Sequence, residues 1–385
     1  MTSATAATTA PSRLPVGKLL AFTTAGFLAI ITETMPAGLL PHIADGLRVS
    51  ESQAGQLVTL YALGSVAAAI PVITATRGIR RRPLLSAAVA SMVVCNAVTA
   101  ASSNYALTLS ARFAAGMAAG VIWGLLAGYA RRLVPEHAQG RALAVVGVGQ
   151  PIALALGVPL GTWLGGLMDW RAAFWITSAL AAALLVWIRA AVPDQPGQDV
   201  RDRLALRQVF TIPGVRPVLA VVLLWILAHN VFYTYISAFL ARSGLQQRTD
   251  LMLLIFGAAA IAGIWATGTL VDTRLRATML VSLGVFALAT GVLAVAGTAP
   301  VVAIIGIIAW GLAFGGAPTL LQAAIGKAAG AEADVAQSML VTVFNLAVAG
   351  GGLLGGILLQ GNGTQSLPGA AAVIALAALA VAATR

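Results

Sequence analysis

Long, nearly unbroken apolar stretches fill most of this chain, and short polar turns separate them. Twelve such stretches can be counted, at 18–40, 53–75, 83–102, 106–130, 140–166, 171–192, 215–240, 249–271, 277–297, 300–322, 333–359 and 367–384. An α-helix needs about 20 apolar residues to cross a bilayer, whereas membrane-barrel strands alternate over about 10 residues. Because the backbone in lipid must satisfy its own hydrogen bonds, continuous stretches of this length predict twelve membrane-spanning helices.

The composition agrees with a chain embedded in lipid. Hydrophobic residues make up 59% of the 385 residues and charged residues only 9%, which is too little charged cover for a soluble chain. The net charge of +11 could attract nucleic acid. A nucleic-acid patch also needs aromatic or polar side chains among its cations, and these loops are too short to supply them. We therefore expect a lipid bilayer as a partner and no nucleic acid.

Basic residues divide unevenly between the two sides of the membrane. With the N-terminus in the cytoplasm, the loop cations on the outer side are Arg48, Arg171, Arg242 and Arg248, and nearly all the others lie inside. Cytoplasmic loops carry an excess of Lys and Arg, so we predict a multi-pass protein of the bacterial cytoplasmic (inner) membrane with both termini in the cytoplasm. Residues 1–16 are rich in Ala, Thr and Ser and predict a disordered tail without a cleaved signal peptide.

The chain divides near its midpoint into two similar halves. Residues 193–214 form a polar stretch with Pro193, Pro196 and Gly197, which predicts a cytoplasmic linker between bundles at 17–192 and 215–385. Trp123-Gly124-Leu125 recurs as Trp310-Gly311-Leu312, and Gly165-Gly166 recurs as Gly355-Gly356. Duplicated parallel halves are a known transporter layout with the site between them. We predict an all-α membrane protein of two pseudo-symmetric six-helix bundles.

Several motifs give this layout a family resemblance over residues 18–384. The sequence resembles the major facilitator superfamily, and within it the bacterial sugar-efflux and drug:proton antiporter group. The stretches that carry the resemblance are 33–50 (ETMPAGLLPHIADGLRVS), Arg112 to Gly120 with its spaced glycines, Gly157-Val158-Pro159-Leu160-Gly161, Asp169 to Phe174, Thr234-Tyr235-Ile236 and Phe344-Asn345.

The resemblance implies roles for residues outside any binding site. Gly157, Pro159 and Gly161 match a fifth-helix antiporter motif, and the basic turn with Arg80 and Arg81 matches the loop after the second helix. That loop departs from the family pattern, because Pro71 and Ala75 stand where a Gly and an Asp are usual, whereas the second copy keeps Gly268 and Asp272. The favoured interpretation of Arg80, Arg81 and Arg82 is positive-inside topology.

Two charged residues fall deep inside predicted spans. Glu33 is the only carboxylate far from a span end, and Arg112 lies at a similar depth, about 10 Å from the outer surface at 1.5 Å per residue. Charges at mid-membrane are costly, which makes them functional candidates. The resemblance places the first and fourth helices around one cavity, so Glu33 and Arg112 are our candidates for proton coupling. The alternatives are a neutral, packed carboxyl for Glu33 and a helix-packing role for Arg112.

Other polar and aromatic residues are candidates for a substrate cavity. His229 and Tyr233 share a face of the seventh helix at i,i+4, with Asn230 beside them. Hydrogen-bonded helix contacts are the alternative. Weaker candidates, for which packing is the alternative, are Trp123, Gln150, Trp310, Gln322 and Asn345.

The glycines and the scattered histidines point to no cofactor. Small residues let membrane helices approach closely, so the glycines at 157–166 and 350–356 predict tight contacts between the halves, and Pro151 and Pro159 predict kinks. No Walker motif or zinc-ligand spacing is present, so we expect no metal, no cofactor and the proton gradient as energy source.

These observations predict a secondary active transporter rather than an enzyme. We expect a monomer that exports a small sugar-like or drug-like solute in exchange for protons by alternating access. Alternatives are a facilitator or importer of sugar-like or nucleoside-like solutes, or a membrane-embedded enzyme. An enzyme would need catalytic residues clustered at one depth, and the sequence shows none. A receptor or scaffold would need a sizeable soluble region.

Overall fold

The structure is a computed structural model that describes residues 14–69, 76, 78–135, 138–197, 209–330 and 333–384. Throughout these ranges the regular elements are helices. Pro71 and Ala75 lie outside the described residues, and the side chain of Asp272 is likewise not described.

The helices of the first half follow the predicted stretches. They are α1 (Val16–Gly38), α2 (Leu40–Leu47), α3 (Glu51–Ala69), α5 (Arg81–Ala101), α6 (Tyr105–Arg132), α7 (Gln139–Gly147), α8 (Gly149–Ile152), the π-helical turn η2 (Ala153–Gly157), α9 (Val158–Leu167) and α10 (Trp170–Ala191).

The second half is built in the same way, except that two of its predicted spans are joined in one helix. Its elements are α12 (Val215–Tyr233), α13 (Ile236–Leu240), the 3-10 turns η3 (Ala241–Ser243) and η4 (Gln246–Arg248), α14 (Thr249–Ala296), α15 (Pro300–Gly315), α16 (Ala317–Ala329), α17 (Ala333–Asn362) and α18 (Ser366–Ala383). Two predicted spans join in α14 across a kink at Arg274, where the backbone is non-helical.

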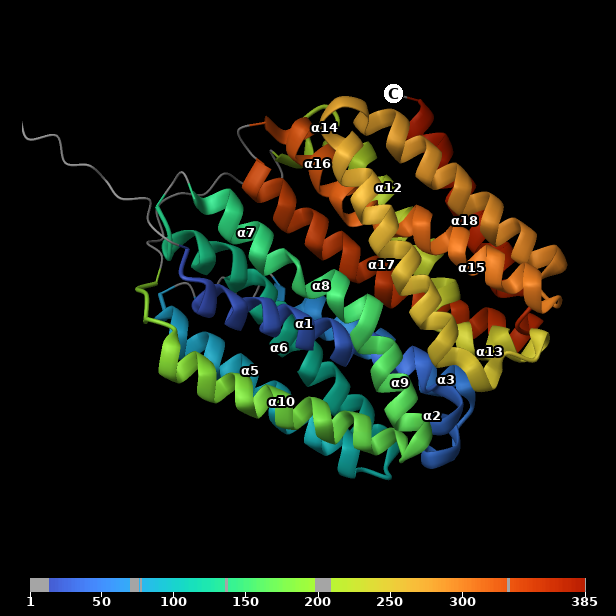
Figure 1. Cartoon of the computed structure of the whole chain (residues 1–385), viewed down its shortest axis with the longest axis horizontal. Helices are drawn as coiled ribbons and strands as arrows, with labels where there is room; N and C mark the ends of the chain where they lie inside the picture. Colours follow the sequence, from blue (N-terminus) through green and yellow to red (C-terminus); the bar gives the residue numbers. More distant parts are fainter. Residues whose placement is uncertain are drawn as a thin grey trace, which may run out of the picture.

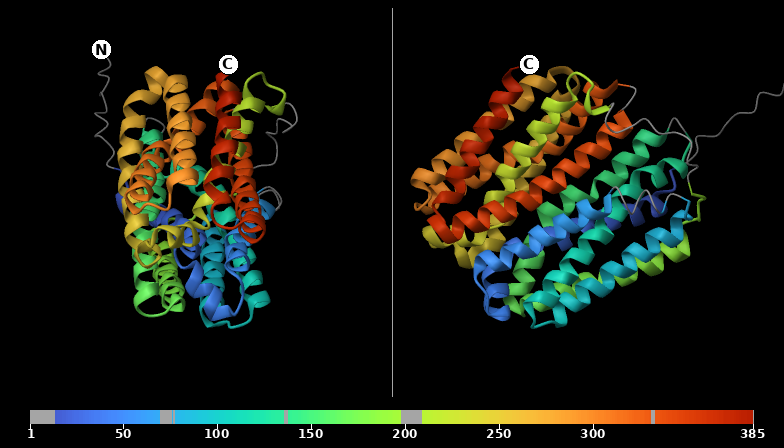
Figure 2. Two further views of the ribbon diagram at one scale, coloured as in Figure 1. Left: turned by 90° about the vertical axis from the view of Figure 1, so that its right-hand side faces the viewer. Right: turned by 180° about the vertical axis from the view of Figure 1, so that it is seen from behind.

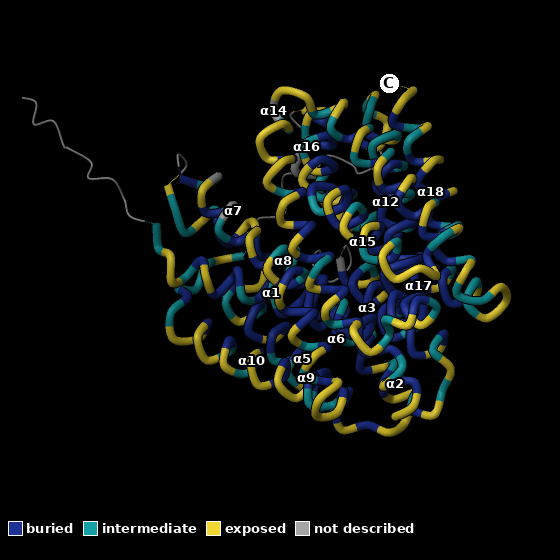
Figure 3. Tube along the Cα trace, turned by 45° about the vertical axis from the view of Figure 1, so that its right-hand side comes forward, coloured by how far each residue is buried: buried dark blue, intermediate teal, exposed yellow. Residues whose placement is uncertain are grey.

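Eleven helical segments in the described chain are long and apolar enough to cross a membrane. The remaining predicted span, 53–75, corresponds to α3, whose first turns carry polar residues and whose expected end lies outside the described residues. Large apolar side chains point outward along the spans, with Trp265 75% and Val295 89% exposed. Figure 3 shows exposed positions recurring along the outer helix faces. Exposed apolar surface on this scale suits contact with lipid.

Three spans are interrupted, two of them next to a proline. Pro159 has no N–H to donate and its ring crowds the preceding turn, and the π-helical turn η2 directly precedes it. The seventh span breaks at Tyr235, and the tenth breaks at Gly316 before a proline in the first turn of α16. These breaks place irregular backbone inside the bundle, where protein covers it.

The two halves lie side by side (Figures 1 and 2), and each half contacts the other through its second and fifth spans. In the first half α3 packs on α6 and α5 packs on α10; in the second α14 packs on α15 and α18. Across the halves, α3 packs on α17, while η2 and α9 pack on the first part of α14. The second and fifth spans thus pair with the eleventh and eighth.

The glycines of the fifth span differ from our expectation of contacts between halves. A Cβ at Gly157 would overlap the Ile31 side chain of α1, and one at Gly161 would lie 2.8 Å from the sulfur of Met35, so both glycines face their own half. In the eleventh span the expectation holds, because Gly352 and Gly356 lie against α3. The fifth span reaches the other half at Ala155, against Gly257.

This packing makes a testable prediction for Gly157, at the end of η2. Gly157→Leu should reduce transport strongly while leaving membrane insertion intact, because overpacking against α1 costs about 1–3 kcal/mol. Gly166→Leu is the matched control, since no atom lies within 4 Å of a Cβ there. Transport rates and membrane content of the two variants provide the measurement, and equal rates would contradict the close approach of η2 to α1.

Candidate transport site

The first half encloses a buried charged pair of residues. Glu33 of α1 is 7% exposed and Arg112 of α6 is fully buried. Arg112 donates from Nε to the carbonyl of Leu57 at 3.2 Å and from Nη2 to the main-chain carbonyl of Glu33 at 3.4 Å. The two side chains make no ion pair, and Nη1 of Arg112 has no hydrogen-bond partner. Arg112 therefore holds the backbone of α1, with one nitrogen unused.

Close helix crossing brings Arg112 to the backbone of α3. Cβ atoms at Gly116 and Gly64 would overlap the main-chain carbonyls of Tyr61 and Phe113 respectively, so glycine is required on both helices. Arg112 and Gly116 lie one turn apart on the same face of α6. The spaced glycines of the fourth span thus let the guanidinium reach the carbonyl of Leu57.

Further polar residues surround Glu33 on neighbouring helices. Tyr61 of α3 donates its hydroxyl to the carbonyl of Ala29 at 2.8 Å, and its ring lies 4.7 Å from the Arg112 Cζ. Asn96 of α5 donates to the Thr32 hydroxyl at 3.2 Å. The sequence reasoning did not select Tyr61, although it is the only tyrosine in the stretch 53–75.

The second half encloses an aromatic cluster around His229. Trp310 donates from Nε1 to Nδ1 of His229 at 3.1 Å, and Phe314 stacks on the imidazole with centroids 3.5 Å apart. Tyr233 stacks on His229 one turn earlier, with ring centroids 5.0 Å apart, and the Phe256 ring lies 4.8 Å from that of Trp310. The Tyr233 hydroxyl is buried without a hydrogen-bond partner. The rings of the cluster cover one another, and the Tyr233 hydroxyl is the polar group left for a ligand.

The remaining cavity candidates do not converge on this cluster. Asn230 and Asn345 each donate to a carbonyl one turn earlier in their own helix, those of Ile226 and Val341. Trp123 packs on Gly26 in the first half. Gln150 is half-buried, and Gln322 is exposed and accepts at its main-chain oxygen from Gln337.

The two halves meet at Tyr235, between α12 and α13. Its hydroxyl donates to the carbonyl of Gly352 at 2.8 Å and accepts from the Gln56 side chain at 3.4 Å. The Ser52 hydroxyl of α3 donates to the carbonyl of Gly356 at 3.0 Å. These contacts join α3 to α17 near the end of the molecule that carries α2 and α13 (Figure 1). The sequence places Tyr235 in the Thr234-Tyr235-Ile236 motif but does not indicate this contact between the halves.

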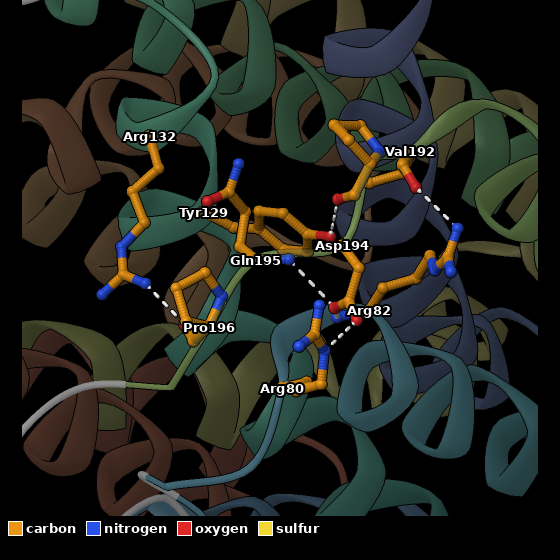
Figure 4. A network of polar contacts seen from close by, with 9 residues as sticks. Arg80, Arg82, Tyr129, Arg132, Val192, Asp194, Gln195 and Pro196 are labelled. Atoms are coloured by element: carbon orange, nitrogen blue, oxygen red, sulfur yellow. Dashed lines mark hydrogen bonds and ion pairs between the residues drawn. The ribbon is translucent and has the colours of Figure 1, made fainter.

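At the opposite end, the beginning of the polar linker binds the first half (Figure 4). Asp194 forms an ion pair with Arg80 and accepts from the Arg82 N–H at 3.1 Å. The hydrogen bond from Arg80 holds the pKa of the Asp194 carboxyl below its ordinary value. The buried Arg81 donates its N–H to the carbonyl of Gln195 at 2.8 Å. Arg80 thus has a structural partner in addition to its place in the basic turn.

Tyr129 and Arg132 at the end of α6 extend this linker contact. The Tyr129 hydroxyl donates to the carbonyl of Pro193 at 2.6 Å, and Arg132 donates to the carbonyl of Pro196 at 2.8 Å. Residues 193–196 are therefore tied to both α5 and α6. Within the ranges that the structure describes, no group of three or more His, Cys, Asp or Glu side chains could hold a metal ion.

The fold and these sites define a multi-span membrane carrier with a charged pair in one half and an aromatic cluster in the other. The sequence model of the Major Facilitator Superfamily matches residues 22–352. The chain therefore belongs to the major facilitator superfamily and is a secondary transporter, as the sequence predicted.

Similar proteins span nearly the whole chain. The "Probable sugar efflux transporter" of Mannheimia succiniciproducens is 26% identical, covering 94% of this chain and 92% of the relative. The "Purine ribonucleoside efflux pump NepI" of Escherichia coli is 31% identical, covering 88% and 86%. The "Transcription regulatory protein OpdE" of Pseudomonas aeruginosa is 29% identical, covering 94% and 91%. The crystal structure of the nucleoside transporter NupG (D323A mutant) shares the fold with a TM-score of 0.75 and 15% identity, covering 94% and 99%.

Proposed function

We propose that this transporter exports a small organic solute in exchange for protons, with Glu33 as the group that binds the proton. The observation that carries the proposal is the burial of Glu33, the only buried acidic residue in the described part of the chain. Its carboxylate lies within a span, beside an arginine whose charge is not neutralised by an ion pair. A titratable group in this position can take a proton from one side and release it to the other.

Alternating access would work through the two helix contacts between the halves, that of α3 with α17 and that of η2 and α9 with α14. In the present arrangement α3, Tyr235 and α17 are in contact at one end of the molecule, which we propose faces outward. Separation of these helices, with closure at the inner end, would open the site outward. Release of the proton would leave a carboxylate that attracts Arg112. A movement of the Arg112 guanidinium would be transmitted to both α1 and α3, because the guanidinium donates hydrogen bonds to main-chain carbonyls of both helices.

The substrate class follows from the aromatic cluster and the names of the relatives. Ring faces with a histidine and an unpaired tyrosine hydroxyl suit a planar, polar solute. Two relatives bear the names of sugar and purine ribonucleoside efflux proteins. We therefore propose a nucleoside-like or sugar-like solute contacted by His229, Tyr233 and Trp310. Trp123, Gln150, Asn230, Gln322 and Asn345 remain second-rank candidates for the cavity.

We further propose a monomer that requires no cofactor beyond the proton gradient and catalyses no reaction. Gly157, Pro159, Gly161 and the basic turn with Arg80 and Arg81 would act in the conformational change, and Asp272 would be the second-half counterpart of that turn. An importer or facilitator is the competing function. A facilitator would equilibrate solute without responding to a pH gradient.

Proteoliposomes test the proposal directly. Purified protein should accumulate inosine, arabinose or both against a concentration gradient when a pH difference is imposed, and dissipation of that difference should abolish accumulation. Counterflow with the same solutes detects transport that is not coupled to protons. Counterflow without any response to the pH difference would support a facilitator and contradict the proposal.

Cysteine labelling tests the proposed orientation. In a Cys95→Ala background, Gln247→Cys should react with an impermeant reagent added outside cells, because we propose that the end with η4 faces outward. Thr384→Cys, at the opposite end, should stay protected. Both residues are exposed. The opposite pattern of labelling would invert the assignment made from the basic residues.

A further inference from the structure

Tyr61 joins three helices at the point where Arg112 passes Glu33. Its ring faces the guanidinium at 4.7 Å from Cζ, and its hydroxyl donates to the carbonyl of Ala29 at 2.8 Å. Ala29 lies one turn before Glu33 in α1, so this hydrogen bond fixes the ring relative to the carboxylate. Tyr61 is 1% exposed, so little water competes for either contact. An aromatic face attracts a cation more strongly when both are desolvated.

The hydrogen bonds of Arg112 leave part of its donor capacity unused. Nε and Nη2 bond the carbonyls of Leu57 and Glu33, whereas the buried Nη1 has no partner. A buried donor without a partner is costly, so the group needs either a compensating contact or an alternative position. The Tyr61 ring supplies the compensating contact, and the Glu33 carboxylate is the acceptor that an alternative position would reach.

Few other groups can influence the charge of Glu33. The titratable groups that interact with it or with Arg112 are Tyr61 of α3, Arg112 of α6 and Cys95 of α5. From α10 the neighbour is the ring of Phe174, 5.7 Å from the guanidinium. Arg112 is the single cation in this set, so its distance from the carboxylate decides how readily Glu33 ionises.

On the basis of the proposed coupling role of Glu33, we propose that Tyr61 is a positioning residue for proton exchange. It holds the Arg112 guanidinium on main-chain carbonyls and away from the Glu33 carboxylate, and thereby sets the pH at which Glu33 releases its proton. Without the ring, the guanidinium moves toward the carboxylate through its unused nitrogen. The ionised form of Glu33 then becomes more favourable, and the proton is released at a lower pH.

Infrared titration of the purified full-length protein tests this assignment without knowledge of the substrate. The carboxylic C=O band that Glu33→Gln removes reports the protonation of Glu33. Tyr61→Leu should move the midpoint of this band about one pH unit toward acid, as expected when an opposite charge approaches a carboxyl. Tyr61→Phe keeps the ring over Arg112, so the midpoint in this variant should move by no more than about a third of that shift.

Two comparisons make the outcome decisive. Tyr61→Met also lacks a ring and should shift in the same direction as Tyr61→Leu, which separates loss of the ring from local repacking. An unchanged midpoint in both ringless variants, or a shift toward alkaline pH, would overturn the assignment. A Phe variant that shifts as far as the Leu variant would overturn it too, because the hydroxyl rather than the ring would then matter.

The proposed function fails separately from this inference. If Glu33→Gln still couples transport to the pH gradient, Glu33 is not the coupling group, yet the infrared midpoints still report whether Tyr61 positions Arg112. If Glu33→Gln loses coupling while the ringless variants titrate like the parent protein, only the role of Tyr61 is wrong.

Discussion

Glu33→Gln should abolish uphill transport while preserving downhill exchange of the same solute. Glutamine keeps the shape of the side chain but cannot carry a proton. For each proton exchanged per solute, a pH difference of one unit can drive about tenfold accumulation in the unmodified protein, since one pH unit is about 1.4 kcal/mol. The Gln variant should show none of this accumulation. Inosine uptake into proteoliposomes with and without a pH gradient, alongside counterflow, provides the measurement.

Asp45→Asn is the matched control for this experiment. Asp45 is an exposed acid on α2, outside the spans, and its neutralisation should leave accumulation unchanged. If Glu33→Gln accumulates solute in response to the pH gradient as the parent protein does, Glu33 is structural. If the variant loses both counterflow and accumulation, the substitution has instead damaged the binding site or the fold.

The membrane fold could be predicted from the sequence because lipid imposes a simple rule on the backbone. Stretches of about 20 apolar residues have no alternative to a helix in hydrocarbon, so counting them was sufficient. Interruptions were harder to predict. Pro159 marked one of them, but the break at Tyr235 lies in an ordinary apolar stretch and depends on the contacts of that residue with α3 and α17.

The candidate site could be predicted only in part. A charge in an apolar span is conspicuous, so Glu33 and Arg112 could be selected from the sequence. The bonds of Arg112 to main-chain carbonyls could not be predicted, since they depend on where α3 and α6 cross. His229 and Tyr233 were recognised from helical spacing, whereas the contact with Trp310 joins residues 81 positions apart.

Asp194 shows a further limit of sequence analysis. Its position in a polar stretch is typical of a solvated linker. Its ion pair with Arg80 exists because α5 begins beside the end of α10, which is a tertiary relation. Tertiary packing likewise decides which neighbouring helix each glycine faces. Small residues indicate close packing, but not which neighbouring helix they contact.

Gly55→Leu should hold the outer end of the transporter open and reduce turnover severely. A Cβ at Gly55 of α3 would overlap the hydroxyl and ring of Tyr235 from the opposite half. If this overpacking destabilises only the closed state, by about 1–3 kcal/mol, the equilibrium shifts about 5- to 150-fold toward the open state. Both the transport rate and the access of outside reagents to the interface should therefore change.

Thr59→Cys provides the accessibility measurement for this variant. Thr59 lies one turn after Gly55, is 3% exposed and faces Gly352 of the other half. In a Cys95→Ala background an impermeant outside reagent should label Thr59→Cys slowly, and much faster when Gly55→Leu is present.

Gly128→Leu on α6 is the control, since no atom lies within 4 Å of a Cβ there. Equal labelling in all variants would mean that Tyr235 does not close the outer end.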